Sequence, residues 1–171
     1  VNFFGGHYQQ TVDTGRDFTV QGGSGADAYA SFGVQNTLSY QYFNIDGNVN
    51  VSGGSATGAH AAVTSAVNYQ YDYIGGDFAL RAGTGANASA DWSATTGVRY
   101  QSGSIGGDLV VEAGNAVSGQ GSGAFARFAG GDQRFYNIGG AVRVAGGSAA
   151  GNYAAISGAG PQELGTNYIF Y

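Results

Sequence analysis

The chain has 171 residues, of which 33 are glycine, and its formal charge is −5. Twelve Tyr, ten Phe and a 43% hydrophobic content are enough to bury one core and are too much for a disordered chain. The six cationic side chains are all Arg and lie scattered, so no basic stripe is available to bind nucleic acid. The absence of Cys excludes disulfides, thiol catalysis and Cys-based zinc sites.

The beginning of the chain and its hydropathy bear on localisation. The chain starts at Val1 and contains no Met, so we expect a mature protein that has lost a secretory signal. No segment has the 18 or more apolar residues of a membrane helix, so we expect no transmembrane helix. The predicted localisation is secreted, extracellular or at the cell surface.

We divide the chain into one repeat domain with two short flanks. Residues 1–13 form an N-terminal aromatic segment, residues 14–160 contain about five repeats, and residues 161–171 form a C-terminal strand. The repeats begin at anchor residues that lie 31, 29, 31 and 33 residues apart, namely Thr14, Ile45, Ile74, Ile105 and Ile138. A fixed period of this size indicates a repeat architecture.

Two further blocks recur with the anchors. A Gly-rich block follows each anchor, at 22–26, 53–56, 83–86, 121–124 and 146–149. A Tyr-Gln block precedes the next anchor, at 40–42, 69–71 and 100–101, and we align 134–136 as its altered fourth copy. The order of the three blocks is kept throughout, which supports about five repeats of roughly 31 residues.

Each repeat has the pattern of β-structure. Residues 63–73 and 86–100 alternate apolar or aromatic residues with polar ones, which is the period of a strand. The Gly-Gly and Asp-Gly steps suit tight turns between strands. The predicted fold is therefore all-β, a repetitive β-solenoid or stacked β-meander, and an antiparallel β-barrel is the alternative.

Stacked repeats place equivalent residues above one another, about 4.8 Å apart. We therefore expect a tyrosine column of Tyr40, Tyr69 and Tyr100. Beside it we expect a glutamine column of Gln41, Gln70 and Gln101, in which the side-chain amides bond to one another.

The sequence nominates no catalytic group and no cofactor. His7 and His60 are the two His residues, and neither lies in a nucleophile or metal-binding motif, so we expect no enzyme. Calcium is the one ion left open. Residues 22–30 match the calcium-binding nonapeptide of β-rolls, with its carboxylate at Asp27. The turn residues Asp17, Asp77 and Asp108 form a second candidate set, although turns favour Asp without any ion.

Both termini are apolar and aromatic. The segments contain Phe3 and Phe4 at one end and, at the other, Tyr168, Ile169, Phe170 and Tyr171. Strands of this kind pair readily with another chain, so we expect them to form an assembly interface between copies.

The repeats of strand and Gly turn, with Tyr and Gln in register in a chain without Lys or Cys, resemble bacterial functional-amyloid and β-solenoid fibre subunits of the curli type. This resemblance covers residues 14 to about 160 and implies a secreted subunit that polymerises into biofilm or adhesion fibres. A monomeric solenoid adhesin that binds carbohydrate or a surface is the alternative, because exposed Tyr can stack on sugar rings. An outer-membrane β-barrel is the second alternative, because strands alternate and the last residue is aromatic.

Overall fold

The computed structural model describes residues 2–5, 9–34, 40–94, 100–114 and 123–165, and all regular elements in these ranges are β-strands. They form three sheets, which we call A, B and C. In order across sheet A the strands are β1 (Asn2–Gly5), β2 (Gln9–Thr14), β5 (Tyr40–Ile45), β8 (Tyr69–Ile74), β11 (Tyr100–Ile105), β14 (Asp132–Ile138) and β17 (Gln162–Leu164).

Sheets B and C have five strands each. Sheet B consists of β3 (Phe18–Gln21), β6 (Val49–Ser52), β9 (Phe78–Arg81), β12 (Leu109–Glu112) and β15 (Val142–Ala145). Sheet C consists of β4 (Tyr29–Val34), β7 (His60–Ser65), β10 (Ser89–Ala94), β13 (Phe125–Gly130) and β16 (Tyr153–Gly158).

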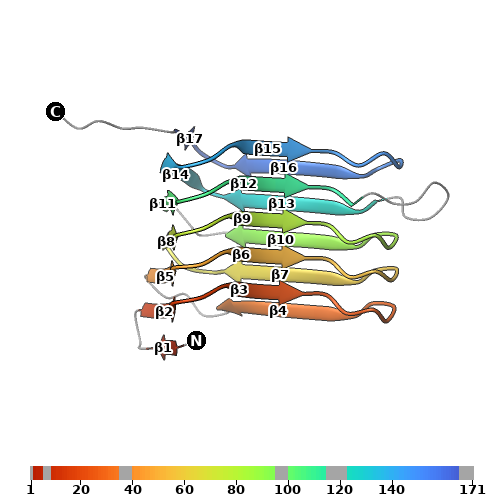
Figure 1. Cartoon of the computed structure of the whole chain (residues 1–171), viewed down its shortest axis with the longest axis horizontal. Coiled ribbons are helices and arrows are strands. Elements are labelled where there is room, and N and C mark those ends of the chain that lie inside the picture. The colour runs from red at the N-terminus through yellow and green to blue at the C-terminus, as the bar shows by residue number, and fades with distance from the viewer. Residues whose placement is uncertain (1, 6–8, 35–39, 95–99, 115–122, 166–171) are drawn as a thin grey trace.

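The chain winds through the three sheets in a repeating coil. Each coil contributes one strand to sheet A, one to sheet B and one to sheet C, and the next coil lies on top of it (Figure 1). Among the described strands every pair is parallel except β1–β2, which is antiparallel. The predicted β-solenoid is therefore confirmed, and the described residues do not form the antiparallel alternative.

The register follows the repeat that the sequence predicts. Ile45, Ile74, Ile105 and Ile138 are paired in succession in sheet A, and Thr14 pairs with Ile45. The alignment of the fourth repeat needs correction, because a longer connection that includes 115–122 precedes β13. Ser89 pairs with Phe125, so Ala124 corresponds to Ala88 rather than to Ala86.

The turn between sheets B and C lets one coil fit on the next. Between sheets B and C, one residue per coil has a positive φ, at Asp27, Gly58, Asn87, Gly123 and Gly151, with values from 54° to 81°. Gly and Asn adopt this conformation with little strain, and Asp tolerates it. The sequence therefore varies at this position only among residues that the turn accepts.

The core lies between sheets B and C and is closed on one side by sheet A. Trp92 on β10 is fully buried, and its ring centroid lies 4.7 Å from that of Phe43 in sheet A and 5.0 Å from that of Phe78 in sheet B. Phe128, one coil further on, lies 5.1 Å from Phe78. Aromatic rings from all three sheets thus hold successive coils together. Within the described residues there is no helix of the length and hydropathy needed to cross a membrane.

A glycine in the turn after sheet B provides a test of the close stacking. A methyl group added at Gly83 would lie against the carbonyl oxygen of Gly54 in the preceding coil. We predict that Gly83→Ala lowers the free energy of unfolding by about 1–3 kcal/mol, because backbone atoms must move apart. Urea denaturation measures the change.

Gly25 is the matched control, since a methyl group there meets nothing within 4 Å. Gly25→Ala should change stability by less than about 0.5 kcal/mol. Equal effects of the two substitutions would contradict this account of the turn.

Candidate functional surfaces

The tyrosine and glutamine columns lie on opposite faces of sheet A. Tyr40, Tyr69 and Tyr100 are paired in successive strands, as are Gln41, Gln70 and Gln101. Tyr40 and Tyr69 are each 38% exposed, whereas all three of these Gln side chains are fully buried. The glutamines therefore face the core, and the tyrosines form the outer surface of the solenoid.

The glutamine column is longer than the sequence analysis expected. Gln10 precedes Gln41, and Gln133 and Gln162 follow Gln101. The alignment of residues 134–136 as the fourth Tyr-Gln block is corrected by two positions, because Tyr100 pairs with Asp132 and Gln101 with Gln133. The side-chain amide of Gln41 donates to Gln10 Oε1 at 2.9 Å, and that of Gln133 donates to Gln101 Oε1 at 3.1 Å.

A buried carboxyl group interrupts this column. Asp72 on β8 is fully buried at the position that Phe43 occupies in the preceding coil. The Gln70 amide donates to Asp72 Oδ1 at 2.9 Å and Oδ2 at 3.1 Å, and the Gln101 amide donates to Asp72 Oδ2 at 2.8 Å. The Gln70 amide therefore turns to Asp72, and Gln41 Oε1 is left without a hydrogen-bond partner.

Burial controls the ionisation of this carboxyl group. Loss of solvent around Asp72 raises its pKa from 3.8 to about 7, and the hydrogen bonds from Gln70 and Gln101 lower it in part. Sequence reasoning missed Asp72, although its place in the alternation gives a signal. Asp72 lies two residues from both Gln70 and Ile74, so it must share their inward face.

The outer face of sheet A carries stacked tyrosine pairs. The rings of Tyr40 and Tyr69 lie 5.3 Å apart with 18° between their planes. Those of Tyr42 and Tyr71 lie 5.0 Å apart at 16°. Parallel rings at these distances cover one face of each partner and leave the ring edges accessible.

The turn carboxylates of the calcium hypothesis are used by the backbone. Asp17 Oδ1 accepts the backbone N–H of Asn48 at 2.8 Å, and Asn48 Oδ1 accepts that of Asp77 at 2.8 Å. In the same way Asp77 Oδ1 accepts the backbone N–H of Asp108 at 2.9 Å, and Asp108 Oδ1 accepts that of Ala141 at 2.8 Å. Each side chain thus fastens the next coil, which explains Asp and Asn at this turn without an ion.

Asp27, the other calcium candidate, lies in the separate turn between sheets B and C. The described part of the chain contains no group of three or more His, Asp or Glu side chains that could hold a metal ion. His7 lies outside the described residues. His60 stands beside Tyr29, with ring centroids 5.4 Å apart and the planes nearly perpendicular.

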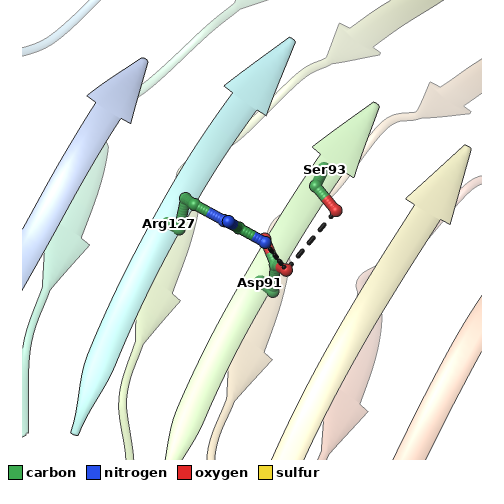
Figure 2. A network of polar contacts seen from close by, with 3 residues as sticks. All are labelled: Asp91, Ser93 and Arg127. Atoms are coloured by element: carbon green, nitrogen blue, oxygen red, sulfur yellow. Dashed lines mark hydrogen bonds and ion pairs between the residues drawn. The ribbon is translucent and has the colours of Figure 1, made fainter. Parts of the chain in front are cut away.

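An ion pair joins two coils on the outer face of sheet C. Arg127 donates from Nε to Asp91 Oδ1 at 3.1 Å and from Nη2 to Asp91 Oδ2 at 2.6 Å, and Ser93 donates to the same carboxylate at 3.4 Å (Figure 2). The hydrogen bond to Asp91 raises the pKa of Arg127. This pair links β10 to β13. Among the paired strands of sheet C, these two are separated by the longest stretch of chain.

The two ends of the solenoid differ between the sheets. Sheet A begins with β1, which contains Phe3 and Phe4 and pairs with β2, and it ends with β17. Sheets B and C begin one strand later, at β3 and β4, and end one strand earlier, at β15 and β16. Tyr168, Ile169, Phe170 and Tyr171 of the expected assembly interface lie outside the described residues.

Apolar side chains reach both ends of sheets B and C. At the far end Val142 and Val144 are 43% and 48% exposed, whereas their partners Leu109 and Val111 in the preceding coil are fully buried. At the near end Phe18 and Val20 are only 6% and 8% exposed, and with Phe32 they line a groove between β3 and β4. In the described residues the core is therefore open to solvent at the far end, and at the near end it is reached only through this groove.

No family model, curated protein or solved structure matches this chain.

The raised pKa of Asp72 predicts an unusual dependence of stability on pH. Below pH 4 this carboxyl is protonated in the folded and unfolded states, and between pH 4 and 7 only the unfolded state ionises. Stability is therefore lost as pH rises to 7. Because the pKa moves from 3.8 to about 7, Asp72→Asn should gain up to about 4 kcal/mol over the parent protein at pH 8.

Urea denaturation between pH 4 and 8 tests this prediction, with Asp27→Asn in an exposed turn as the control. The difference between Asp72→Asn and the parent should grow with pH, and that between Asp27→Asn and the parent should stay small. A pH-independent difference for Asp72→Asn would show that the carboxyl does not titrate as stated.

Gln70 provides a test of the inner column. We predict that Gln70→Leu lowers the free energy of unfolding by about 1–3 kcal/mol, because Asp72 loses a buried donor. The loss should be larger at pH 8 than at pH 5, since the ionised carboxylate depends more on its donors. Gln9→Leu on the exposed face of the first coil is the control, and its effect should be below about 0.5 kcal/mol. A negligible loss for Gln70→Leu would exclude a role for the column in stability.

Proposed function

We propose that this chain is a structural subunit that polymerises end to end into an extracellular filament. The observation that carries the proposal is the pair of open ends of sheets B and C. An open end of a parallel sheet exposes unpaired backbone groups and the cross-section of the core. A further coil forms hydrogen bonds with the backbone groups and covers the core. A second copy of the same chain offers such a coil in the correct register.

The proposed contact continues the solenoid from one copy to the next. Strands β14, β15 and β16 of one copy pair with β2, β3 and β4 of the next, as neighbouring coils do within the chain. Val142 and Val144 then lie over Phe18 and Val20, at the positions equivalent to Leu109 and Val111. This contact is heterologous and does not close, so it produces a filament.

Side-chain columns are compatible with this contact. Tyr153 and Tyr29 occupy the same position of sheet C in the last and first coils, and they are 46% and 62% exposed. Stacking would place Tyr153 against Tyr29 of the next copy. It would also bring Gln133 beside Gln10, which continues the buried glutamine column.

The proposed contact requires β1 and β17 to leave sheet A. Each of them occupies the level that the neighbouring copy would fill. The exchange gives up the four residue pairs of β1–β2 and the three of β14–β17. In return, three strands of each copy pair along their whole lengths. We infer that β1 protects the edge of the monomer, a common device against premature association.

A carbohydrate-binding module is the second candidate, because Tyr40, Tyr69 and Tyr73 are 38%, 38% and 47% exposed. Sugar rings pack on the faces of aromatic side chains. Tyr40 and Tyr69 cover one face of each other, so less ring surface is left for sugar stacking. The open ends therefore support filament formation better than the tyrosines support carbohydrate binding.

The decisive test is Val144→Lys in the full chain. Val144 is 48% exposed, so the monomer should stay folded by circular dichroism. Burying an unpaired ammonium group at the contact is strongly unfavourable, so filament growth should slow by more than about tenfold. Asn50→Lys on the outer face of a middle coil is the control and should polymerise normally. Electron microscopy and light scattering record the filaments.

Removal of residues 1–5 tests whether β1 protects the edge of the monomer or joins one copy to the next. If β1 protects the edge, the truncated chain should nucleate filaments faster than the parent. Slower assembly would make β1 a joining strand and overturn the proposed contact. A parent protein that remains monomeric at all concentrations would exclude the filament function.

A further inference from the structure

The outer face of sheet A brings phenol groups together in pairs. Tyr42 and Tyr71 stack at 5.0 Å, Tyr40 and Tyr69 stack at 5.3 Å, and Tyr40 and Tyr42 on the same strand lie 6.3 Å apart. The paired residues belong to β5 and β8, whose backbones are hydrogen-bonded to each other. The fold therefore holds four phenols in fixed contact at a solvent-accessible surface.

We propose that this tyrosine surface, formed by Tyr40, Tyr42, Tyr69 and Tyr71, is a site of oxidative cross-linking. One-electron oxidation by a peroxide, delivered through a haem peroxidase, joins Tyr42 to Tyr71 and Tyr40 to Tyr69 as dityrosine within one chain. The product is a covalent bond between the second and third coils of the solenoid.

The reaction balances with the peroxide as the only co-reactant. Each phenol gives one electron to the oxidant and its hydroxyl proton to solvent, which leaves a phenoxyl radical shared with the carbons ortho to the oxygen. Two radicals form a bond between two ortho carbons, and the hydrogens on these carbons return to the two oxygens. Two electrons and two protons thus leave the pair, and they reduce one hydrogen peroxide to two waters.

The geometry favours coupling within the pair over other fates of the radical. The ortho carbons lie at the ring edges, which the stacking leaves accessible, and the partner ring is already in contact. Burial and the nearby Tyr42 raise the pKa of Tyr71, so its phenol is neutral at pH 7 and releases its proton on oxidation. A radical on one ring therefore meets its partner before it meets another molecule.

The third tyrosine of the column is held differently. The Tyr100 ring is tilted by 57° from that of Tyr69, with a centroid distance of 6.4 Å. Its hydroxyl lies 3.1 Å from that of Tyr136, and the Arg134 guanidinium lies 5.5 Å from its ring centroid. Tyr100 is thus less well placed for coupling to Tyr69 than Tyr40 is.

Two exposed tyrosines elsewhere provide a comparison. Tyr29 is 62% exposed beside His60, and Tyr153 is 46% exposed and stacked on Phe125. If exposure alone governed the reaction, Tyr29 would react first and link two chains. If pairing governs it, the tyrosine surface reacts first and the product stays monomeric.

The experiment uses the monomeric full chain at low concentration, with a haem peroxidase and hydrogen peroxide. We expect dityrosine fluorescence, a monomer mobility on denaturing gels, and the loss of two hydrogen atoms per link by mass spectrometry. Peptide mapping should locate the links between β5 and β8. The reaction needs no polymerisation, so its outcome is independent of the proposed filament.

Two variants test the assignment. Tyr69→Phe combined with Tyr71→Phe keeps the rings and removes their hydroxyls, and it should abolish most of the intramolecular dityrosine while the circular dichroism spectrum is unchanged. Tyr29→Phe should leave the signal as in the parent. Links mainly between chains through Tyr29, undiminished dityrosine in the double variant, or no dityrosine in the parent would each overturn the proposal.

Discussion

The rest of this structure depends on parallel pairing of successive coils in register, at a spacing of about 4.8 Å. Every side chain then lies directly above and below its equivalents, so each position of the coil must accept the same residue type repeatedly. Isoleucine meets this condition as the last residue of the sheet A strand in four coils. Asp and Asn meet it in the following turn, because each side chain accepts the backbone N–H of the next coil. Repetition in the sequence is therefore a direct consequence of the stacking.

The same constraint makes a single unusual residue affect its neighbours. Asp72 stands where Phe43 stands one coil earlier, and Gly103 stands there one coil later. Two glutamine amides that would otherwise extend the column turn to this carboxyl instead. The desolvated acid is thus tolerated because the repeat places donors on either side of it. In the turn between sheets A and B the Asp carboxylates are exposed. They accept backbone N–H groups there without a comparable loss of solvation.

The sequence predicted the repeat, the strands and the anchor register, because these depend on spacing and on period-two alternation. It did not predict which face of sheet A is buried. Tyrosine is the more apolar residue, yet the structure buries the glutamines and leaves the tyrosines at the surface. The buried face could have been identified from the alternation along the strand, since Gln41, Phe43 and Ile45 alternate with the tyrosines and share one face. The fourth repeat was misaligned for another reason, because the longer connection before β13 changes the spacing of sheet C, and the register of sheet A shifts between Gly103 and Ser104.

The surfaces assigned to the two proposals are physically separate. The stacked tyrosines occupy the second and third coils, and the equivalent positions are Gln9 in the first coil and Asp132 in the fifth. The tyrosine column therefore ends inside each subunit and does not reach the open ends of sheets B and C. A covalent link between β5 and β8 would brace the middle of the solenoid and leave β3, β4, β15 and β16 unmodified. Strengthening a subunit and joining it to the next thus involve different residues, so neither process obstructs the other.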